Sequence, residues 1–562
     1  MKQPWWNHAI VYQIYPKSFK DMDHDGVGDI KGIITKLDYI QSLGVTILWL
    51  NPIFKSPQVD HGYDISDYYQ IDEQFGTMED MDVLISESSK RGLKIILDLV
   101  VNHTSDQHPW FRESMKSKTN PYRDYYIWRD GKNGKEPTNW ASFFEGSAWT
   151  YEQATEQYFF HLFDKKMPDL NWENPKVRKE VYQIAAFWLK KGIAGFRLDA
   201  IIHLAKDQHF QNIESAITGE TYVLAEACYA HVPRVHEFIH GFYEAVHKVE
   251  PDVFLIGEAA SANSKLAKQY TDPDRNELDC IISFEQLETE ILHEDKRLPR
   301  NWQIGYLNLS KLKKTMKQWQ KDLSGHGWSA LFWNNHDMPR LLSRFGDAKY
   351  PRESATMLAT MLYLHRGIPI IYQGEEIGMT NLRLPEIADY EDSGLKEFVV
   401  KAEGLGYSKD EILTSVRACS RQTSRGAMQW NGNPFAGFSE VEPWLGVNDD
   451  YPKINVEKQE RDPVSILNYY RKLLKIRSKW DIFVAGDWQL IDEDNQNLYV
   501  YKRHYGRKSA LVICNFTSQP QPYFYPELSS WTCILSNNEG RERLDNEIIL
   551  SAYECLVVTE ES

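Results

Sequence analysis

Short apolar runs alternate with amphipathic stretches along most of the chain. Eight apolar runs rich in β-branched and aromatic residues are predicted strands: Ala9–Tyr15, Thr46–Leu50, Lys94–Val101, Gly195–Leu198, Val253–Ile256, Cys280–Phe284, Ala330–Trp333 and Ile368–Tyr372. Helical periodicity lies between most of them, as in Met78–Arg91 and Pro175–Lys191. This alternation predicts an α/β fold, a (β/α)₈ TIM barrel. An open doubly wound sheet would usually show a Gly-rich phosphate turn after its first strand, and no such turn follows it here.

Three regions depart from the alternation. The interval from His103 to Pro175 is too long for an ordinary connection, and a second excursion, residues 379–444, follows the eighth strand. After Trp480 only short strands are predicted, typical of an antiparallel β-domain. We therefore expect a barrel built from residues 1–103 and 175–480, a small inserted domain of residues 104–174, and a C-terminal antiparallel β-sandwich of residues 481–562.

Three predicted strands end abruptly in an acidic residue. These are Asp199 after Gly195–Leu198, Glu258 after an apolar run, and Asp337 a few residues beyond another. A buried strand does not carry an unpaired carboxylate cheaply. In a barrel, however, the carboxyl ends of the strands open onto the active-site face. Two carboxylates that face one bond are the machinery of glycoside hydrolysis, so the pattern indicates a glycosidase.

Composition narrows the classes of partner. The 562 residues carry a net charge of −16, which argues against nucleic acid or an anionic membrane surface as a partner. No apolar run approaches the ~18 residues of a membrane span, and the first residues lack a basic start followed by an apolar stretch. The six cysteines are scattered and are expected to be free thiols. We therefore expect a cytoplasmic protein, a monomer or homodimer.

Several motifs in chain order carry a family resemblance. The chain resembles the α-amylase family of retaining glycoside hydrolases (family 13), and within it the oligo-1,6-glucosidase and α-glucosidase group. The resemblance covers essentially the whole chain. The matching segments are Gly62–Tyr68, Asp98–His103, Gly195–Asp199, Gly257–Glu258, Asn335–Asp337, Tyr372–Asn381 and Ser420–Trp430.

The resemblance assigns roles around the reacting bond. Asp199 is implied as the nucleophile, Glu258 as the general acid/base and Asp337 as a support for the distorted sugar. Arg197 lies two residues before Asp199, so on a strand it points to the same face and should hold that carboxylate ionised. A raised pKa is expected for Glu258, because it must be protonated to act as an acid. For Asp98 a structural role is at least as plausible.

The resemblance also implies a pocket for one terminal sugar. An aspartate and an arginine grip the non-reducing end in this group, which implies exo action on short oligosaccharides, with transglucosylation at high sugar concentration. The pocket residues implied by the match are Asp60, Tyr63, His103, Phe144, Phe163, His336, Arg421 and Arg425.

A loop near the N-terminus has the chemistry of a cation site. Acidic side chains recur at Asp21, Asp23, Asp25 and Asp29, and Val27 would add a backbone carbonyl. Hard oxygen ligands at this spacing predict a structural Ca²⁺, or Mg²⁺ in its place; the alternative is an Asp-rich turn without metal. No organic cofactor is expected.

Three positions differ from the usual pattern of the group. Met167 and Met338 replace glutamines, and Ala200 stands where Val accompanies α-1,6 and Thr accompanies α-1,4 specificity. Because alanine is smaller than either residue, we expect α-1,4 bonds to be tolerated beside α-1,6 bonds. The alternatives are a trehalose-6-phosphate hydrolase, which needs a basic pocket for phosphate, and, ranked lower, a sucrose isomerase. A non-catalytic transporter ectodomain would need a membrane span.

Overall fold

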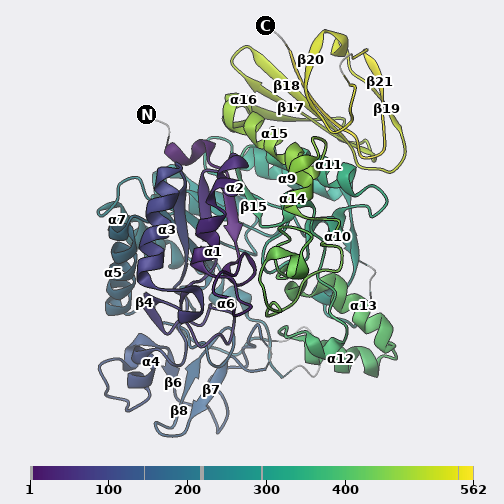
Figure 1. Ribbon diagram of the computed structural model, residues 1–562. Coiled ribbons are helices and arrows are strands. Elements are labelled where there is room, and N and C mark those ends of the chain that lie inside the picture. The colour runs from purple at the N-terminus through teal and green to yellow at the C-terminus, as the bar shows by residue number, and fades with distance from the viewer. Residues whose placement is uncertain (1–3, 145, 215–220, 293–294, 542–543, 561–562) are drawn as a thin grey trace.

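Eight parallel strands form the centre of the protein (Figure 1). The computed structural model describes residues 4–144, 146–214, 221–292, 295–541 and 544–560. An isolated parallel bridge between Ile281 and Ser329 joins the two ends of the eight-stranded sheet and closes it into a barrel. The predicted (β/α)₈ fold is therefore confirmed. In spatial order the strands are β11 (Cys280–Ile282), β10 (Phe254–Glu258), β9 (Gly195–Asp199), β5 (Lys94–Val100), β2 (Ile47–Leu50), β1 (Val11–Ile14), β15 (Ile368–Tyr372) and β14 (Ala330–Leu331).

Amphipathic helices surround the barrel. In α5 (Pro175–Lys191) the buried residues recur at helical spacing, from Val177 and Val181 to Trp188, so that one face covers the sheet. Asn174 caps its start and Gly192, with a φ of 105°, ends it. The other helices between barrel strands or directly after them are α1 (Ile30–Thr35), α2 (Leu37–Ser42), α3 (Met78–Lys90), α6 (Glu226–Tyr229), α7 (Val235–His247), α8 (Ser264–Thr271), α9 (Leu309–Asp322), α10 (Leu341–Phe345), α11 (Pro351–Tyr363), α14 (Val456–Arg461), α15 (Ile466–Lys479) and α16 (Asp481–Val484).

The segment between β5 and α5 forms a small layer of its own. It contains α4 (Pro109–Ser114) and an antiparallel sheet of β6 (Trp128–Arg129), β8 (Gln157–Phe160) and β7 (Trp149–Glu152). Its aromatic side chains Trp140 and Phe160 pack in one cluster with Phe210 and Tyr229, which follow β9. The inserted segment therefore packs against the loop that follows β9, the strand that ends in Asp199.

Two antiparallel sheets make up the C-terminal region. The larger has the order β16 (Asp487–Ile491), β17 (Leu498–Tyr505), β18 (Lys508–Asn515), β22 (Cys555–Glu560) and β20 (Trp531–Ser536). The smaller pairs β19 (Gln521–Phe524) with β21 (Glu547–Leu550), two strands that the sequence pattern did not reveal. Apolar residues from both sheets share one core, as a sandwich requires.

The C-terminal sheets and the inserted segment lie at opposite ends of the barrel (Figure 1). Two helices from the excursion after β15 lie at the same end of the barrel as the inserted segment. They are α12 (Leu395–Gly404) and α13 (Lys409–Cys419). A short hairpin, β12 (Glu290–Leu292) and β13 (Gly305–Leu307), follows β11, and Trp302 in its connection stacks on Phe398 of α12 with ring centroids 5.1 Å apart. Two remaining short strands, β3 (Phe54–Lys55) and β4 (Asp67–Ile71), pair after β2.

Candidate active site

Asp199 and Glu258 end two neighbouring strands, β9 and β10. The strands pair in parallel with Ile256 opposite Arg197, so both carboxylates emerge at the same edge of the barrel. The Arg197 guanidinium contacts both of them, at 2.6 Å from Asp199 Oδ1 and 2.8 Å from Glu258 Oε1. One cation therefore holds the two carboxylates side by side.

A third carboxylate shares this guanidinium. Arg197 lies 2.7 Å from Asp98 Oδ1, and both side chains are buried. Burial raises the pKa of Asp199 well above its usual value; Arg197 opposes the shift, and Glu258 and Asp98 add to it. Burial also raises the pKa of Asp98. Three carboxylates thus surround one cation, and their mutual repulsion and burial outweigh Arg197, contrary to the expectation that this arginine holds Asp199 ionised.

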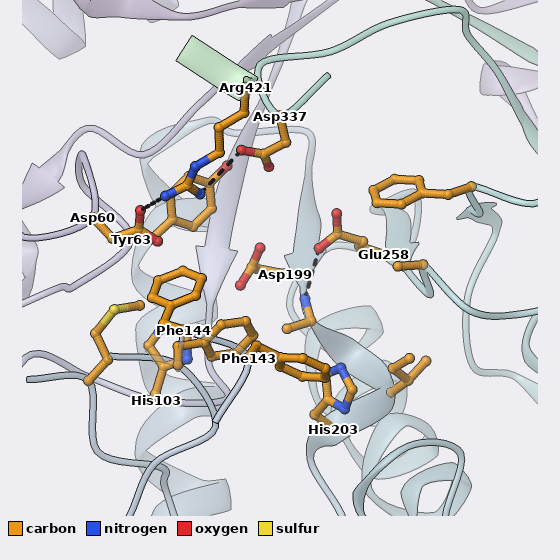
Figure 2. A pocket seen from close by; sticks show the side chains of 16 residues that line it. Asp60, Tyr63, His103, Phe143, Phe144, Asp199, His203, Glu258, Asp337 and Arg421 are labelled. Atoms are coloured by element: carbon orange, nitrogen blue, oxygen red, sulfur yellow. Dashed lines mark hydrogen bonds and ion pairs between the residues drawn. The ribbon is translucent and has the colours of Figure 1, made fainter. Parts of the chain in front are cut away.

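Ala200 turns the chain out of β9 directly after Asp199. Its φ of 48° and ψ of 34° lie in the left-handed region, where a β-branched side chain is strained. Its backbone N–H donates to Glu258 Oε2 over 3.3 Å (Figure 2). The turn therefore helps to orient Glu258, and its small side chain lines the cavity described below.

Charged side chains close one end of the site. Arg421 Nη2 lies 3.0 Å from Asp60 Oδ1, and its Nη1 lies 3.6 Å from Asp337 Oδ1. Asp392, which the sequence did not single out, also holds Arg421: its Oδ1 lies 3.0 Å from Arg421 Nε. Arg425 Nη2 holds the same Asp337 oxygen at 2.6 Å. We call Asp60, Asp337 and Arg421 the clamp.

His336 contacts the clamp residue Asp337, and Tyr63 contacts His336. His336 Nε2 lies 3.0 Å from Asp337 Oδ2 and 2.6 Å from the Tyr63 hydroxyl, and the two rings are stacked. The Tyr63 hydroxyl donates to Asp98 Oδ2 over 3.0 Å, which links the clamp to the Arg197 cluster. Although burial opposes ionisation, His336 and the nearby arginines hold the pKa of Asp337 well below its usual range. Asp337 is therefore a permanent anion in the site.

These groups surround a cavity of about 230 Å³. The clamp lies at one end, and Asp199 and Glu258 lie beside the middle (Figure 2). Three predicted residues, Arg197, His336 and Arg425, are not in its lining but hold residues that are. The predicted residues in the lining are Asp60, Tyr63, His103, Phe144, Phe163, Asp199, Ala200, Glu258, Asp337 and Arg421.

His103 offers a hydrogen-bond donor to the cavity. The Asn102 side-chain amide lies 3.3 Å from His103 Nδ1, so Nδ1 accepts and Nε2 carries the proton. Among the described residues the buried Nε2 has no hydrogen-bond partner, and burial lowers the pKa of the ring to about 4. His103 is therefore a neutral donor that a sugar hydroxyl can satisfy.

Met167, which the sequence singled out as a replacement for glutamine, also lies in the lining, and five further lining residues were missed by the sequence reasoning. Most are apolar and lie outside the strand-end motifs, so their type gave no signal. His203 alone offered one, because it lies four residues after Asp199 on the turn Ile201–His203. The five are Phe143, Ile202, His203, Ala260 and Phe284.

A second cavity of about 450 Å³ adjoins the first and shares Phe284 and Asp337 with it. We call it the outer chamber. The β12–β13 hairpin and the end of α13 line it, and Met338 lies in its wall. Its Arg344 is neutralised by Glu290, which it holds at 3.0 Å and 2.8 Å through Nε and Nη2.

The acidic loop brings three carboxylates together. Oxygen atoms of Asp21, Asp23 and Asp29 all lie within 4.8 Å of one another. Asp21 is buried and both of its oxygens accept backbone N–H groups of the loop. Burial, together with the neighbouring aspartates, raises the pKa of Asp23. Asp25 stands outside this group and accepts from the backbone N–H of Val27 over 2.7 Å.

Known proteins share this architecture. The family model of the alpha amylase catalytic domain matches residues 13–486. The chain belongs to the α-amylase family. It is 48% identical to the oligo-1,6-glucosidase of Parageobacillus thermoglucosidasius over 94% of this chain and 93% of that protein.

Two similar solved structures are named for other activities. The trehalose-6-phosphate hydrolase of Bacillus licheniformis is 43% identical with a TM-score of 0.92, covering 99% of this chain and 100% of that one. The isomaltulose synthase of Klebsiella sp. LX3 is 36% identical with a TM-score of 0.92, covering 100% of both chains. Family membership therefore establishes a glycosidase and leaves the choice of sugar to the site. No helix in the described part of the chain is long and apolar enough to cross a membrane.

Proposed function

We propose that this protein is an exo-acting α-glucosidase of the oligo-1,6-glucosidase type, which releases terminal glucose from short oligosaccharides. The clamp carries the proposal. Arg421 joins Asp60 and Asp337 across one end of a cavity of about 230 Å³, so a sugar chain cannot pass through that end. A cavity closed behind one sugar accepts only a chain terminus.

The first chemical step uses the paired carboxylates. Asp199 attacks the anomeric carbon of the terminal glucose, while Glu258 donates its proton to the departing glycosidic oxygen. The aglycone leaves and a glucosyl ester of Asp199 remains. Asp337, held ionised, accepts hydrogen bonds from hydroxyl groups of the bound sugar and stabilises the positive charge that develops on the ring.

The second step regenerates the enzyme. Glu258, now ionised, takes a proton from water as that water attacks the anomeric carbon, and the ester bond to Asp199 breaks. Two displacements retain the anomeric configuration. A sugar hydroxyl that replaces the water gives transglucosylation by the same route.

The outer chamber favours an unphosphorylated aglycone. Its described lining contains three acidic residues, Glu288, Glu290 and Asp337, and two arginines, Arg300 and Arg344. Of the two arginines, Arg344 is already paired with Glu290. A phosphate needs convergent positive charge. This argues against trehalose 6-phosphate as the principal substrate, despite the similarity to hydrolases of that name.

Kinetics on a panel of sugars test the function. We expect glucose release from isomaltose, with a smaller but measurable rate on maltose because Ala200 leaves room on the aglycone side. The value of kcat/KM on trehalose 6-phosphate should be lower than on isomaltose. Activity confined to the phosphorylated sugar would assign the protein to that hydrolase class instead, and conversion of sucrose to an isomer would assign it to the isomerases.

A divalent cation on the acidic loop is also proposed. Asp21, Asp23 and Asp29 present only oxygen donors, the ligands that Ca²⁺ and Mg²⁺ prefer, and a cation would relieve the repulsion among them. Asp25 and the carbonyl of Val27 are the remaining candidates from the sequence. The ion would brace the loop before α1 and take no part in the reaction.

Removal of the cation is expected to lower thermal stability. Ca²⁺ at about one hundred times its Kd adds about 2.7 kcal/mol to the free energy of unfolding, so chelation should lower the melting midpoint by a few degrees. Thermal melts in EDTA, with Ca²⁺ or Mg²⁺ added back, measure the effect. In Asp21→Asn the response to metal should disappear; an unchanged melt of the wild type in EDTA would count against the site.

We also propose that the enzyme acts in the cytoplasm on imported oligosaccharides. All six cysteines are free in the structure, which fits a reducing compartment.

A further inference from the structure

Another buried ion pair is connected to His103. The ammonium of Lys206, in the loop after β9, lies 2.7 Å from Oδ2 of Asp169, which belongs to the inserted segment. Both side chains are buried, and neither lines the cavity. The two displacements of the proposed reaction use neither residue. Because two charges are costly to remove from water, a pair in this position calls for an explanation.

The side-chain amide of Asn102 joins the pair to His103. Its oxygen accepts from Lys206 Nζ over 2.9 Å, and its nitrogen donates to Asp169 Oδ2 over 3.0 Å. The same amide nitrogen lies 3.3 Å from His103 Nδ1. Lys206, Asp169 and Asn102 therefore form a closed ring of contacts, and one corner of that ring touches the histidine.

The ion pair gives the Asn102 amide a single orientation. An ammonium group has only donors, and an ionised carboxylate has only acceptors. Lys206 therefore requires the amide oxygen, and Asp169 requires the amide nitrogen. Turning the amide over would place its oxygen against the carboxylate and its N–H groups against the ammonium, which is costly in a buried site. The second N–H of the amide is thus left to face His103.

The backbone around this ring is held as well. His103 and Asp169 form an antiparallel bridge, and the N–H of Leu170 donates to the carbonyl oxygen of Asn102 over 2.8 Å. The other oxygen of Asp169 accepts from the N–H of Leu162 over 2.9 Å. Asn102 therefore cannot move away from His103 without breaking several hydrogen bonds.

The donor state of His103 complements the rest of the cavity. Since Nδ1 accepts from Asn102, Nε2 carries the proton and can donate to a ligand. A sugar hydroxyl has one proton, and once it gives that proton to a carboxylate it can be held further only by a donor. Four carboxylates line the cavity: Asp60, Asp199, Glu258 and Asp337. The opposite tautomer of His103 would add one more acceptor.

We propose that the Lys206–Asp169 ion pair positions His103: through Asn102 it keeps the proton on Nε2, so that His103 donates to a hydroxyl of the bound glucose. The inference rests on the proposed glucosidase function, which places the terminal glucose in this cavity. Lys206 and Asp169 are then positioning residues, because they act on the sugar only through His103.

Lys206→Met tests the proposal. Without its cation, the buried Asp169 is expected to take up a proton, so it can donate to the amide oxygen and Asn102 is free to turn over. The proton of His103 should then move, in part or fully, to Nδ1. NMR of protein labelled with ¹⁵N-histidine shows which nitrogen carries the proton, and the signals lost in His103→Phe identify His103. A proton that stays on Nε2 would overturn the proposal.

A second variant covers the case in which Lys206→Met does not fold. Lys206→Met combined with Asp169→Asn leaves no unpaired charge in the buried site. The new amide can keep the contact with the N–H of Leu162 through its oxygen, so it presents N–H groups to Asn102 in place of an acceptor. The Asn102 amide should turn over, and His103 should carry its proton on Nδ1. An unchanged tautomer in this variant would equally refute the proposal.

Activity measures whether the effect passes through His103. Loss of one hydrogen bond should lower kcat/KM of Lys206→Met on isomaltose roughly 3- to 10-fold. When Lys206→Met is added to His103→Phe, the further loss should be less than about 2-fold, since the group that the pair positions is already absent. The same loss in both backgrounds would mean a structural role of Lys206 and contradict the proposal.

Lys313→Met is the matched control. Lys313 is a buried lysine of α9, and its Nζ donates to the carbonyl oxygens of Asp492 and Asn495 over 2.9 Å and 2.6 Å. It does not line the cavity, so the tautomer of His103 and kcat/KM should both be retained. An altered tautomer in this control would contradict a specific role of Lys206. A wild type that releases no glucose would instead refute the glucosidase function and leave the NMR result standing, so the two failures are distinct.

Discussion

Asp199→Asn is expected to lower kcat on isomaltose by at least about 10⁴-fold. The amide is almost the same shape but cannot form the glucosyl ester, so the first displacement has no nucleophile. A good leaving group does not restore the reaction, so p-nitrophenyl α-glucoside should be hydrolysed as poorly as isomaltose. Steady-state rates on both substrates measure the loss. Isothermal titration calorimetry with glucose checks that the variant still binds the sugar.

The same substitution is expected to leave the melting temperature unchanged or to raise it. Burial raises the pKa of Asp199 in the folded protein, so the ionised carboxylate opposes folding at pH values above its ordinary pKa. Asparagine removes that cost at pH 7, and the gain should vanish below about pH 4, where the unfolded carboxyl is also protonated. A lower melting temperature would indicate that Asp199 serves the fold instead.

Asp98→Asn is the comparison variant. Asp98 contacts the same Arg197 nitrogen at 2.7 Å and is more deeply buried than Asp199, but it does not line the cavity. Its activity should fall by a much smaller factor than that of Asp199→Asn. Equal losses would show that the ion cluster as a whole, and not a nucleophile, is what the first variant removes.

Glu258→Ala is expected to show a loss that depends on the leaving group. Without an acid, kcat/KM on isomaltose should fall about 10²- to 10⁴-fold. The loss on p-nitrophenyl α-glucoside should be much smaller, because that leaving group needs little protonation. Rates on the two substrates, measured side by side, give the ratio.

Azide distinguishes the retaining route from direct displacement. Glu258→Ala cannot activate water, so the glucosyl ester of Asp199 should accumulate, and azide, which needs no base, should speed its breakdown. The expected product is α-glucosyl azide, identified by NMR. β-Glucosyl azide, or no acceleration on either substrate, would contradict a covalent intermediate on Asp199.

Much of the barrel could be predicted because its signals are local. Apolar runs such as Gly195–Leu198 are buried strands whatever surrounds them, and a carboxylate directly after such a run has to emerge at the end of the sheet. The strands β19 and β21 escaped prediction, because each alternates buried with exposed positions over only four residues. A periodic pattern over four residues often arises by chance, so it does not identify a strand.

The sequence by itself determined the family, the barrel and the three carboxylates at strand ends, since these depend on residues close together in the chain. Only the tertiary structure decided how the site is closed and charged. Arg421 meets Asp60 across 361 positions of sequence, and Asp392, from a segment without a motif, fixes it there. The gathering of Asp98, Asp199 and Glu258 around the single Arg197 guanidinium likewise arises from partners that folding brings together.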